Sequence, residues 1–304
     1  MVLSVDSMLD RRRLKRHLSV WRILAVTALV GLVAIVVHEN SDERSGLLAG
    51  SYVARLAING VITADDARDR AIANLASDDN VQAVIVRIDS PGGTVVGGEN
   101  LYRGLRAVAA KKPVVAVMGQ LAASGGYMTA IAADYIVARE ATITGSIGVI
   151  LQTFDMTGLF DKLGVKPESV KSSPLKGQPN PLEPFNAAAR AAAEAVVRDM
   201  YEMFVAMVAE RRNLARDAAL ALSDGRIFTG RQAVANGLID AIGGEDVARR
   251  WLASTHNVAI SVPLHDVAII RKGQWWRQAI EGTIGKTLFS ERLRLDGLVA
   301  LWHP

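Results

Sequence analysis

The alternation of short apolar runs with helix-type segments constrains this fold more than any other feature of the chain. Residues 81–88, with the sequence VQAVIVRI, form a strongly apolar run of strand length. Further strand-type runs lie at 52–58, 113–118 and 134–138, and helix-type segments separate them at 64–77 and 98–111. Such alternation is typical of βαβ units, in which helices join parallel strands and cover the sheet. The sequence therefore predicts an α/β fold built on a mostly parallel sheet.

Residues 18–38 are predicted to anchor the chain in a membrane. They are almost entirely apolar, and about 20 such residues suffice to cross a bilayer. The basic cluster RRRLKR precedes them, so the positive-inside rule places residues 1–17 in the cytoplasm and the remainder outside. A cleaved signal peptide is the alternative, but residues 36–40, VVHEN, lack the small-x-small pattern of a cleavage site. We therefore expect an uncleaved anchor, followed by a polar tether over 39–50.

The charge and composition argue against several classes of protein. The chain of 304 residues carries a formal net charge of +4, and six basic and two acidic side chains within residues 1–22 account for all of it. The remaining residues carry no net charge, so they lack the excess of positive charge that is typical of a nucleic-acid-binding surface. The chain has no cysteine and no histidine between residues 52 and 250, which disfavours a zinc hydrolase, and it lacks GxGxxG and a Walker lysine, which disfavours nucleotide binding. We expect no metal or other cofactor, although carboxylates alone could still hold a metal.

Ser124 stands between the strand-type run at 113–118 and a helix-type run at 126–133. The free N–H groups and positive dipole at a helix start favour negative charge. A serine there can attack a carbonyl while its own N–H helps to hold the oxyanion that forms. The alternative is structural, because serine is a preferred N-cap and Gly125 with Gly126 allows close packing.

The histidine-free stretch limits how such a serine could be activated. The remaining arrangement is a serine paired with a lysine that burial keeps neutral. Lys176 lies on a loop over 172–184 whose four prolines make it stiff, and Lys171 lies just before this loop in a strand-type run at 168–171. The alternative for either is an ordinary solvated lysine.

Two other stretches offer polar groups near strand ends. Gly92 and Gly93 follow the apolar run at 81–88 in the sequence DSPGG, where successive N–H groups can converge on one oxygen, although an ordinary tight turn is equally consistent. Ser146 lies in a glycine-punctuated strand-type run at 144–150. It is either a polar residue of a strand end or a hydrogen-bond partner of a neighbouring catalytic group.

The folded domain is predicted to span 51–250, and 251–304 is predicted to be a tail. From residue 261 onward the sequence is basic and aromatic, with Trp275 and Trp276 among its residues. Such composition favours an interface, either with the membrane surface or with another subunit.

Six segments together carry a resemblance to a known family. They are, in order, DSPGG, QLAASGGYMTA, TGSIGV, FDKLGV, KSSPLK and GRIFTGRQAVANGLID. In this order they resemble the signal peptide peptidase A family of serine peptidases, in its short single-copy form, over residues 51–250. The resemblance implies a ClpP/crotonase-like spiral of βαβ units and a homo-oligomeric ring. It also implies an endopeptidase of the bacterial cytoplasmic membrane that degrades leftover signal peptides, with its single-pass catalytic domain on the periplasmic side.

The resemblance also implies roles for individual residues. Ser124 matches the family's nucleophile, Lys176 its general base, and Ser146 a serine that positions this lysine. The short form builds its site between neighbours, so Lys176 could serve the Ser124 of an adjacent subunit. Lys171 stays the rival base.

The implied oxyanion hole comes from Gly92 and Gly93, together with the N–H of Ser124 or Gly125. Two other functions stay open. One is a crotonase-type acyl-CoA enzyme, which needs no serine nucleophile. The other is an inactive scaffold that organises membrane partners.

Overall fold

The chain divides into two compact units, Met1–Gly50 and Ser51–Pro304. The structure, a computed structural model, describes residues 21–27, 29–31, 50–270 and 298–301. In the first unit, residues 21–27 and 29–31 are helical and exposed. None of the helices in the described ranges is both long and apolar enough to cross a membrane. The rest of the expected anchor over 18–38, the basic segment 1–17 and the tether up to residue 49 lie outside the described residues.

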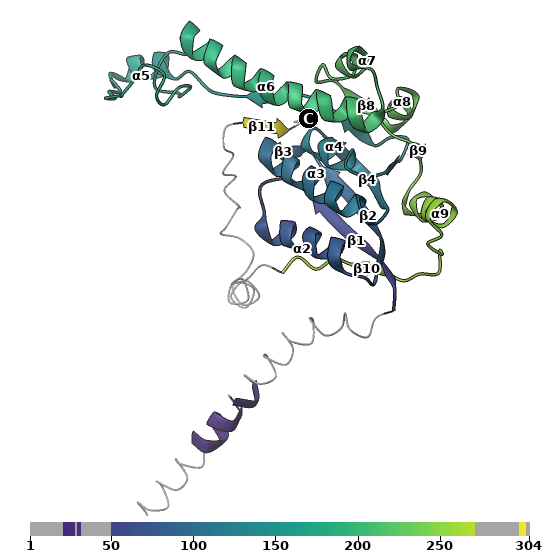
Figure 1. The fold of residues 1–304 in the computed structure, drawn as a ribbon. Helices are drawn as coiled ribbons and strands as arrows, with labels where there is room; N and C mark the ends of the chain where they lie inside the picture. Colours follow the sequence, from purple (N-terminus) through teal and green to yellow (C-terminus); the bar gives the residue numbers. More distant parts are fainter. Residues whose placement is uncertain (1–20, 28, 32–49, 271–297, 302–304) are drawn as a thin grey trace, which may run out of the picture. The chain divides into compact units, whose positions relative to one another are not determined.

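The second unit is built on an eight-stranded, mostly parallel sheet, which confirms the predicted α/β class (Figure 1). The path of hydrogen-bonded strands is β10-β1-β2-β4-β5-β9. These strands are β10 (Leu264–Asp266), β1 (Tyr52–Asn59), β2 (Val81–Ser90), β4 (Val114–Ala123), β5 (Tyr135–Ala138) and β9 (Ala241–Ile242). All pairs along this path are parallel. Two further strands, β6 (Ile143–Gly145) and β8 (Ile227–Thr229), extend the sheet beside the end of β4 and pair antiparallel with each other.

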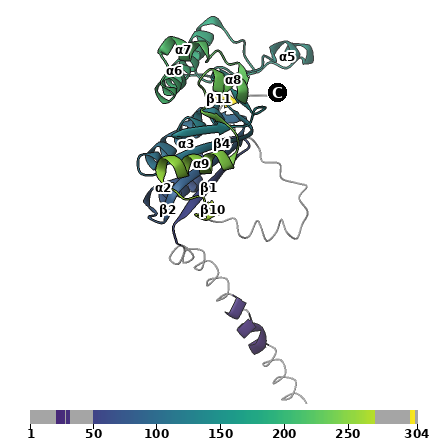
Figure 2. The same cartoon turned by 90° about the vertical axis from the view of Figure 1, so that its right-hand side faces the viewer.

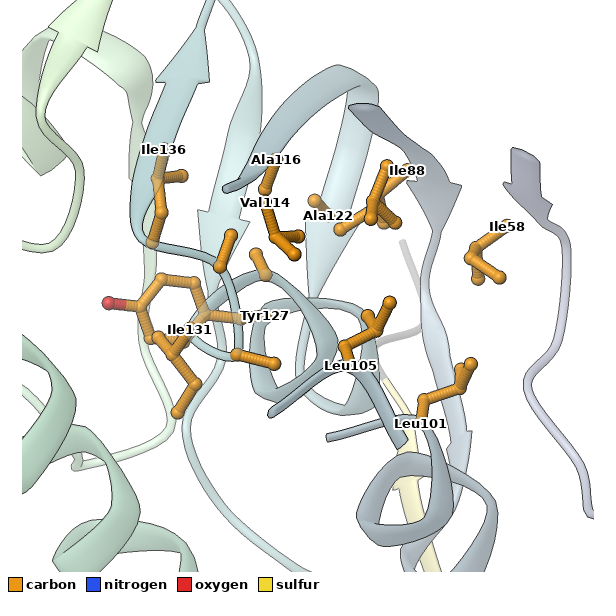
Figure 3. Close-up of a cluster of buried hydrophobic side chains, with 14 of the residues drawn as sticks. Ile58, Ile88, Leu101, Leu105, Val114, Ala116, Ala122, Tyr127, Ile131 and Ile136 are labelled. Carbon is orange, nitrogen blue, oxygen red and sulfur yellow. The ribbon is translucent and has the colours of Figure 1, made fainter. Parts of the chain in front are cut away.

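Helices bury both faces of the sheet, which explains why β2 is apolar almost throughout. Val84, Val86 and Ile88 face one core cluster, whereas Ala83 and Ile85 face the other. Parallel strands that are covered on both faces have apolar residues at nearly every position of their sequence. The first face is covered by α2 (Asp66–Ser77), α3 (Val95–Ala109) and α4 (Gly125–Ala130), whereas α9 (Glu245–His256) covers the second. Figure 3 shows Leu101, Leu105, Tyr127 and Ile131 packed with the side chains of the strands on the first face.

A long helix and a projecting segment complete the unit. Helix α6 (Ala187–Arg212) contributes Phe204 and Val208 to the first core cluster through its C-terminal half. The short helices α7 (Arg216–Ala221) and α8 (Gly230–Ala235) follow it. Helix α5 (Thr157–Leu163) buries none of its residues, and in both views it lies apart from the strands of the main sheet (Figures 1 and 2).

Three short strands form a second sheet in the order β3-β11-β7. Its members are β3 (Gly92–Thr94), β7 (Ile150–Leu151) and β11 (Leu298–Leu301), and β11 pairs antiparallel with both others. The predicted run at 144–150 is therefore not one strand. It breaks at Ser146, whose φ of 48° is incompatible with an extended strand, and its two ends join different sheets.

The structure differs from two other expectations. The predicted strand at 168–171 is wrong, because the segment has no partner strand and Val170 is fully exposed. The chain also contributes to the main sheet beyond residue 250. Helix α9 runs to His256, and β10 then adds a strand beside β1, held by the Arg55 to Asp266 ion pair at 2.5 Å.

Candidate active site

Ser124 lies at the junction of β4 and α4 in a strained backbone conformation. Its φ is 53° and its ψ is −119°, a region that residues other than glycine seldom occupy. Such a conformation costs on the order of 1–3 kcal/mol and is retained mainly at functional sites. The hydroxyl makes no capping hydrogen bond with the described part of α4. The structural alternative, in which Ser124 serves as an N-cap, therefore lacks the hydrogen bond that would justify it.

The two glycines after Ser124 allow α4 to approach the neighbouring backbone closely. A Cβ atom on Gly126 would lie 2.8 Å from the carbonyl oxygen of Ser90. On the facing helix, a Cβ on Gly98 would lie 3.5 Å from the Cα of Gly125. Glycine at these positions therefore lets α4, α3 and the end of β2 meet beside Ser124.

The DSPGG segment is held by hydrogen bonds to the end of β1 and to the turn after it. The Ser90 hydroxyl donates to the Gly60 carbonyl at 2.6 Å, and the Gly92 N–H donates to the Ser90 oxygen at 3.1 Å. Ile62 bonds across this segment, with its N–H donating to the Gly92 carbonyl and its own carbonyl accepting from the Thr94 N–H, both at 2.8 Å. A Cβ on Gly93 would lie 1.7 Å from the Ile62 oxygen, so only glycine fits there.

These contacts sort the four expected oxyanion donors into two groups. The Gly92 N–H is committed to Ser90, and the Ser124 N–H donates to the Gly145 carbonyl at 2.8 Å. Gly93 and Gly125 are then the better candidates, and in this structure Gly93 is paired with Ala300 of β11. Ser90 was not singled out from the sequence, although its place inside DSPGG was a signal that could have drawn attention to it.

Ser124 and Ser146 line one cleft of about 760 Å³. Ser146 reaches it from the end of β6, where its N–H donates to the Arg226 carbonyl at 2.8 Å. The structure thus brings together the two serines that the sequence singled out. The apolar part of the lining includes Ile147, Val149, Ile150, Leu151 and Val197.

One face of α6 forms the opposite wall of the cleft. Its charged side chains there are Arg190, Glu194, Arg198 and Glu202, and Tyr201 lies among them. Since α-helical residues four apart share a face, this spacing places alternating charges along the cleft. Sequence reasoning missed these residues, although their spacing in an otherwise alanine-rich helix was a usable signal.

No lysine lines the cleft within the described part of the chain. Lys176 is exposed on the segment between α5 and α6. Lys171 instead forms an ion pair with Glu183 at 2.5 Å, and the Ser169 hydroxyl and the Gln178 amide both donate to the same carboxylate at 2.8 Å. The hydrogen bond from Lys171, followed by the one from Ser169, lowers the pKa of Glu183.

The two histidines among the described residues both lie away from the cleft. His265 stacks on Tyr52 and His256 lies against Trp251, and neither histidine lines the cleft. Across the described ranges there is no cluster of three or more histidine, aspartate or glutamate side chains that could hold a metal ion.

Comparisons with known proteins place the chain in a family. The family model described as "Peptidase family S49" matches residues 106–259. A protein of Synechocystis sp. is 39% identical over 204 residues, which cover 66% of this chain and 73% of that protein. The protein named "Serine protease SPPA, chloroplastic" from Arabidopsis thaliana is 34% identical over 222 residues, which cover 72% of this chain and 32% of that protein.

A comparison with solved structures gives a weaker likeness. A ClpP1 mutant from Listeria monocytogenes has a TM-score of 0.43 at 17% identity, and the match covers 62% of this chain and 91% of that one. The assignment therefore rests on the sequence relatives. With a family model that matches half of its length, and with relatives above 30% identity, the chain belongs to peptidase family S49, the family of the SppA serine proteases, and is a serine peptidase.

Proposed function

We propose that this chain is a membrane-anchored endopeptidase that uses a Ser/Lys dyad, Ser124 and Lys176, to degrade signal peptides left after their release from preproteins. The observation that carries the proposal is the strained backbone of Ser124, with a hydroxyl that makes no capping bond to the described residues of α4 and that lines a cleft. A structural serine would have no reason to bear that strain.

The first step is nucleophilic attack on a peptide carbonyl. Lys176, acting as the general base, accepts the proton of Ser124 as its Oγ attacks. The N–H groups of Gly93 and Gly125 hold the oxyanion, each contributing on the order of a few kcal/mol. Protonated Lys176 then donates its proton to the leaving amine, and water repeats the sequence on the acyl-enzyme. Ser146, on the rim of the same cleft, positions the lysine.

Lys176 acts across a subunit boundary in this proposal. The segment that carries it extends apart from the main sheet and exposes aliphatic side chains, among them Leu159 (48%), Leu163 (66%) and Leu182 (47%). Such surface is costly in water and is typical of a protein interface. A neighbouring subunit of a ClpP-like ring would cover it and would receive Lys176 at its own cleft.

Lys171 is disfavoured as the base by its contacts. Its amine is held by the Glu183 carboxylate at 2.5 Å, so it is already engaged and is not directed at a serine. The Glu183 carboxylate also receives bonds from Ser169 and Gln178 on either side of Lys176.

The lining of the cleft supports the proposed substrate class. The aliphatic side chains of Ile147, Val149 and Leu151 suit the apolar cores of signal peptides. Anchoring through residues 18–38, with the catalytic unit on the periplasmic side of a bacterial membrane, would place the cleft where such peptides are released.

Mixing two inactive variants tests both the dyad and its location. The full chain with Ser124→Ala and the full chain with Lys176→Ala should each lose hydrolysis of a signal-peptide substrate. After dissociation and reassembly as an equal mixture, about a quarter of sites should combine an intact serine with an intact neighbouring lysine and regain activity.

Lys171→Ala is the matched control and should keep the wild-type turnover number. A mixture that stays inactive would place the dyad within one subunit or discard it. Full activity of Ser124→Ala would instead revive an acyl-CoA reaction without a serine nucleophile. Absence of hydrolysis and of labelling by a serine-reactive probe in the wild-type chain would favour the scaffold.

A further inference from the structure

One peptide group links the two serines of the cleft to strand β8. The Gly145 carbonyl accepts the Ser124 N–H at 2.8 Å, and the Ser146 N–H donates to the Arg226 carbonyl, also at 2.8 Å. This carbonyl and this N–H belong to the same peptide group, the one that joins Gly145 to Ser146. Because a peptide group is planar, any rotation of it moves both hydrogen bonds together. Its orientation therefore couples the backbone of Ser124 to the position of β8.

The backbone on either side of this peptide group has an uncommon conformation. The φ angle is 82° at Gly145 and 48° at Ser146, so two successive residues have positive φ. A residue other than glycine seldom adopts such an angle unless its surroundings impose it. Glycine tolerates positive and negative φ about equally, so Gly145 alone does not hold the peptide group in place. The side chains that pack around Gly145 therefore decide whether this conformation persists.

The Phe228 ring makes the closest of these side-chain contacts. A Cβ atom on Gly145 would lie 2.6 Å from Cδ2 and 3.2 Å from Cε2 of Phe228, so the ring fills the space beside the Gly145 Cα. Phe228 is half-buried and packs against the first core cluster, and it is not among the residues that line the cleft. It belongs to β8, which pairs with β6 in a register that sets Phe228 opposite Thr144. The ring thus reaches the peptide group from behind the cleft.

Contacts at the end of β8 fix the position from which the ring is presented. Thr229 caps α8, since the Gln232 N–H donates to its hydroxyl at 3.3 Å and its own N–H donates to the Gln232 side chain at 2.9 Å. The next residue, Gly230, approaches the main chain so closely that a Cβ atom there would lie 2.0 Å from the Arg139 carbonyl oxygen. A shift of β8 would therefore disturb both the cap and this close approach.

We propose that Phe228 is a positioning residue, whose ring holds the Gly145–Ser146 peptide group and thereby keeps Ser124 and Ser146 in their present conformations. The inference rests on the proposed function only for its kinetic consequence, because a displaced nucleophile attacks a carbonyl more slowly. Its physical basis needs only the ring contact and the two hydrogen bonds. Without the ring, Gly145 is free to rotate, and the Ser124 N–H loses its acceptor when the peptide group turns.

Truncating the ring tests this contact. Phe228→Ala opens the space beside Gly145 and leaves the main chain unchanged, whereas Phe228→Leu keeps most of the side-chain volume and is the conservative variant. Tyr102→Ala is the matched control. Tyr102 lies on α3 and is also a half-buried aromatic residue that packs against the first core cluster and does not line the cleft. It reports the effect of lost packing alone.

Amide hydrogen exchange, resolved to single residues in the full chain, is a readout that does not depend on turnover. In Phe228→Ala, the amides of Ser124 and Ser146 should exchange about tenfold faster or more, because both lose their acceptors when the peptide group turns. Phe228→Leu should bring both rates back to within about threefold of wild type. Tyr102→Ala should leave these two rates unchanged even if it lowers the melting temperature. If Phe228→Ala does not fold, Phe228→Val carries the same prediction.

Kinetic measurements on the same variants separate this inference from the proposed function. Where the wild-type chain hydrolyses a peptide, Phe228→Ala should lower kcat by about tenfold or more and leave KM nearly unchanged, with Phe228→Leu restoring kcat. Faster exchange of the two amides in a chain whose wild type hydrolyses nothing would uphold the role of the ring and remove the peptidase mechanism. Unchanged exchange in Phe228→Ala, or equal acceleration in Tyr102→Ala, would overturn the inference whatever happens to kcat.

Discussion

Gly93→Ala tests the assignment of the oxyanion donors. The added Cβ would lie 1.7 Å from the carbonyl oxygen of Ile62. Since carbon and oxygen atoms normally approach to about 3.3 Å, either β3 or the Ile62 backbone must move by roughly 1.5 Å. The Gly93 N–H moves with β3, and a displacement of this size takes it out of hydrogen-bond reach of the oxyanion.

The expected loss is that of one oxyanion donor. Removal of such a donor lowers kcat by about 10²–10³-fold, and the clash itself should destabilise the fold by about 1–3 kcal/mol. The assay is steady-state hydrolysis of a fluorogenic peptide, with the melting temperature measured on the same sample. KM should change little, because the donor acts mainly on the transition state.

Gly104→Ala is the control that separates loss of the oxyanion donor from destabilisation of the fold. This glycine lies on α3, where an added Cβ would meet the Ile72 side chain at 3.2 Å, away from the cleft. The control should lower the melting temperature at most modestly and leave kcat unchanged. If Gly93→Ala destabilises the protein but keeps kcat within about threefold of wild type, Gly93 does not supply the oxyanion donor and the reasoning fails.

Two further predictions concern stability. Tyr127 is fully buried and donates to the Leu238 carbonyl at 2.8 Å, so Tyr127→Phe should cost about 1–3 kcal/mol in chemical denaturation; an unchanged midpoint would mean that the carbonyl finds another donor. Tyr52 donates to Asp78 at 2.7 Å, and burial, with this bond, raises its pKa to about 12 from a reference value of 10.0. Because the folded pKa lies above the unfolded one, the stabilisation is present below pH 10 and is lost between pH 10 and about 12. Tyr52→Phe should remove this loss from a pH series of unfolding free energies, and an unaltered series would contradict the assignment.

Local pattern was enough to predict much of the framework. The run at 81–88 is buried on both faces of the sheet, and its apolar character follows from that position. Ser124 was singled out as a candidate from local sequence, because a strand-type run, a serine and two glycines before a helix-type run lie within a few residues of one another. The run at 168–171 also has the local pattern of a strand, but no other strand pairs with it in the structure. Its local pattern therefore gave a wrong prediction.

Tertiary structure alone decided how the site is arranged. The positive φ of Ser124, the commitment of the Gly92 N–H to Ser90 and the α6 wall of the cleft depend on contacts between segments far apart in the chain. The pairing of β11 with β3 joins residues about 200 positions apart. Sequence periodicity reports only which face of a strand or helix is buried, whereas hydrogen-bond partners and cleft walls are set by which elements meet in space.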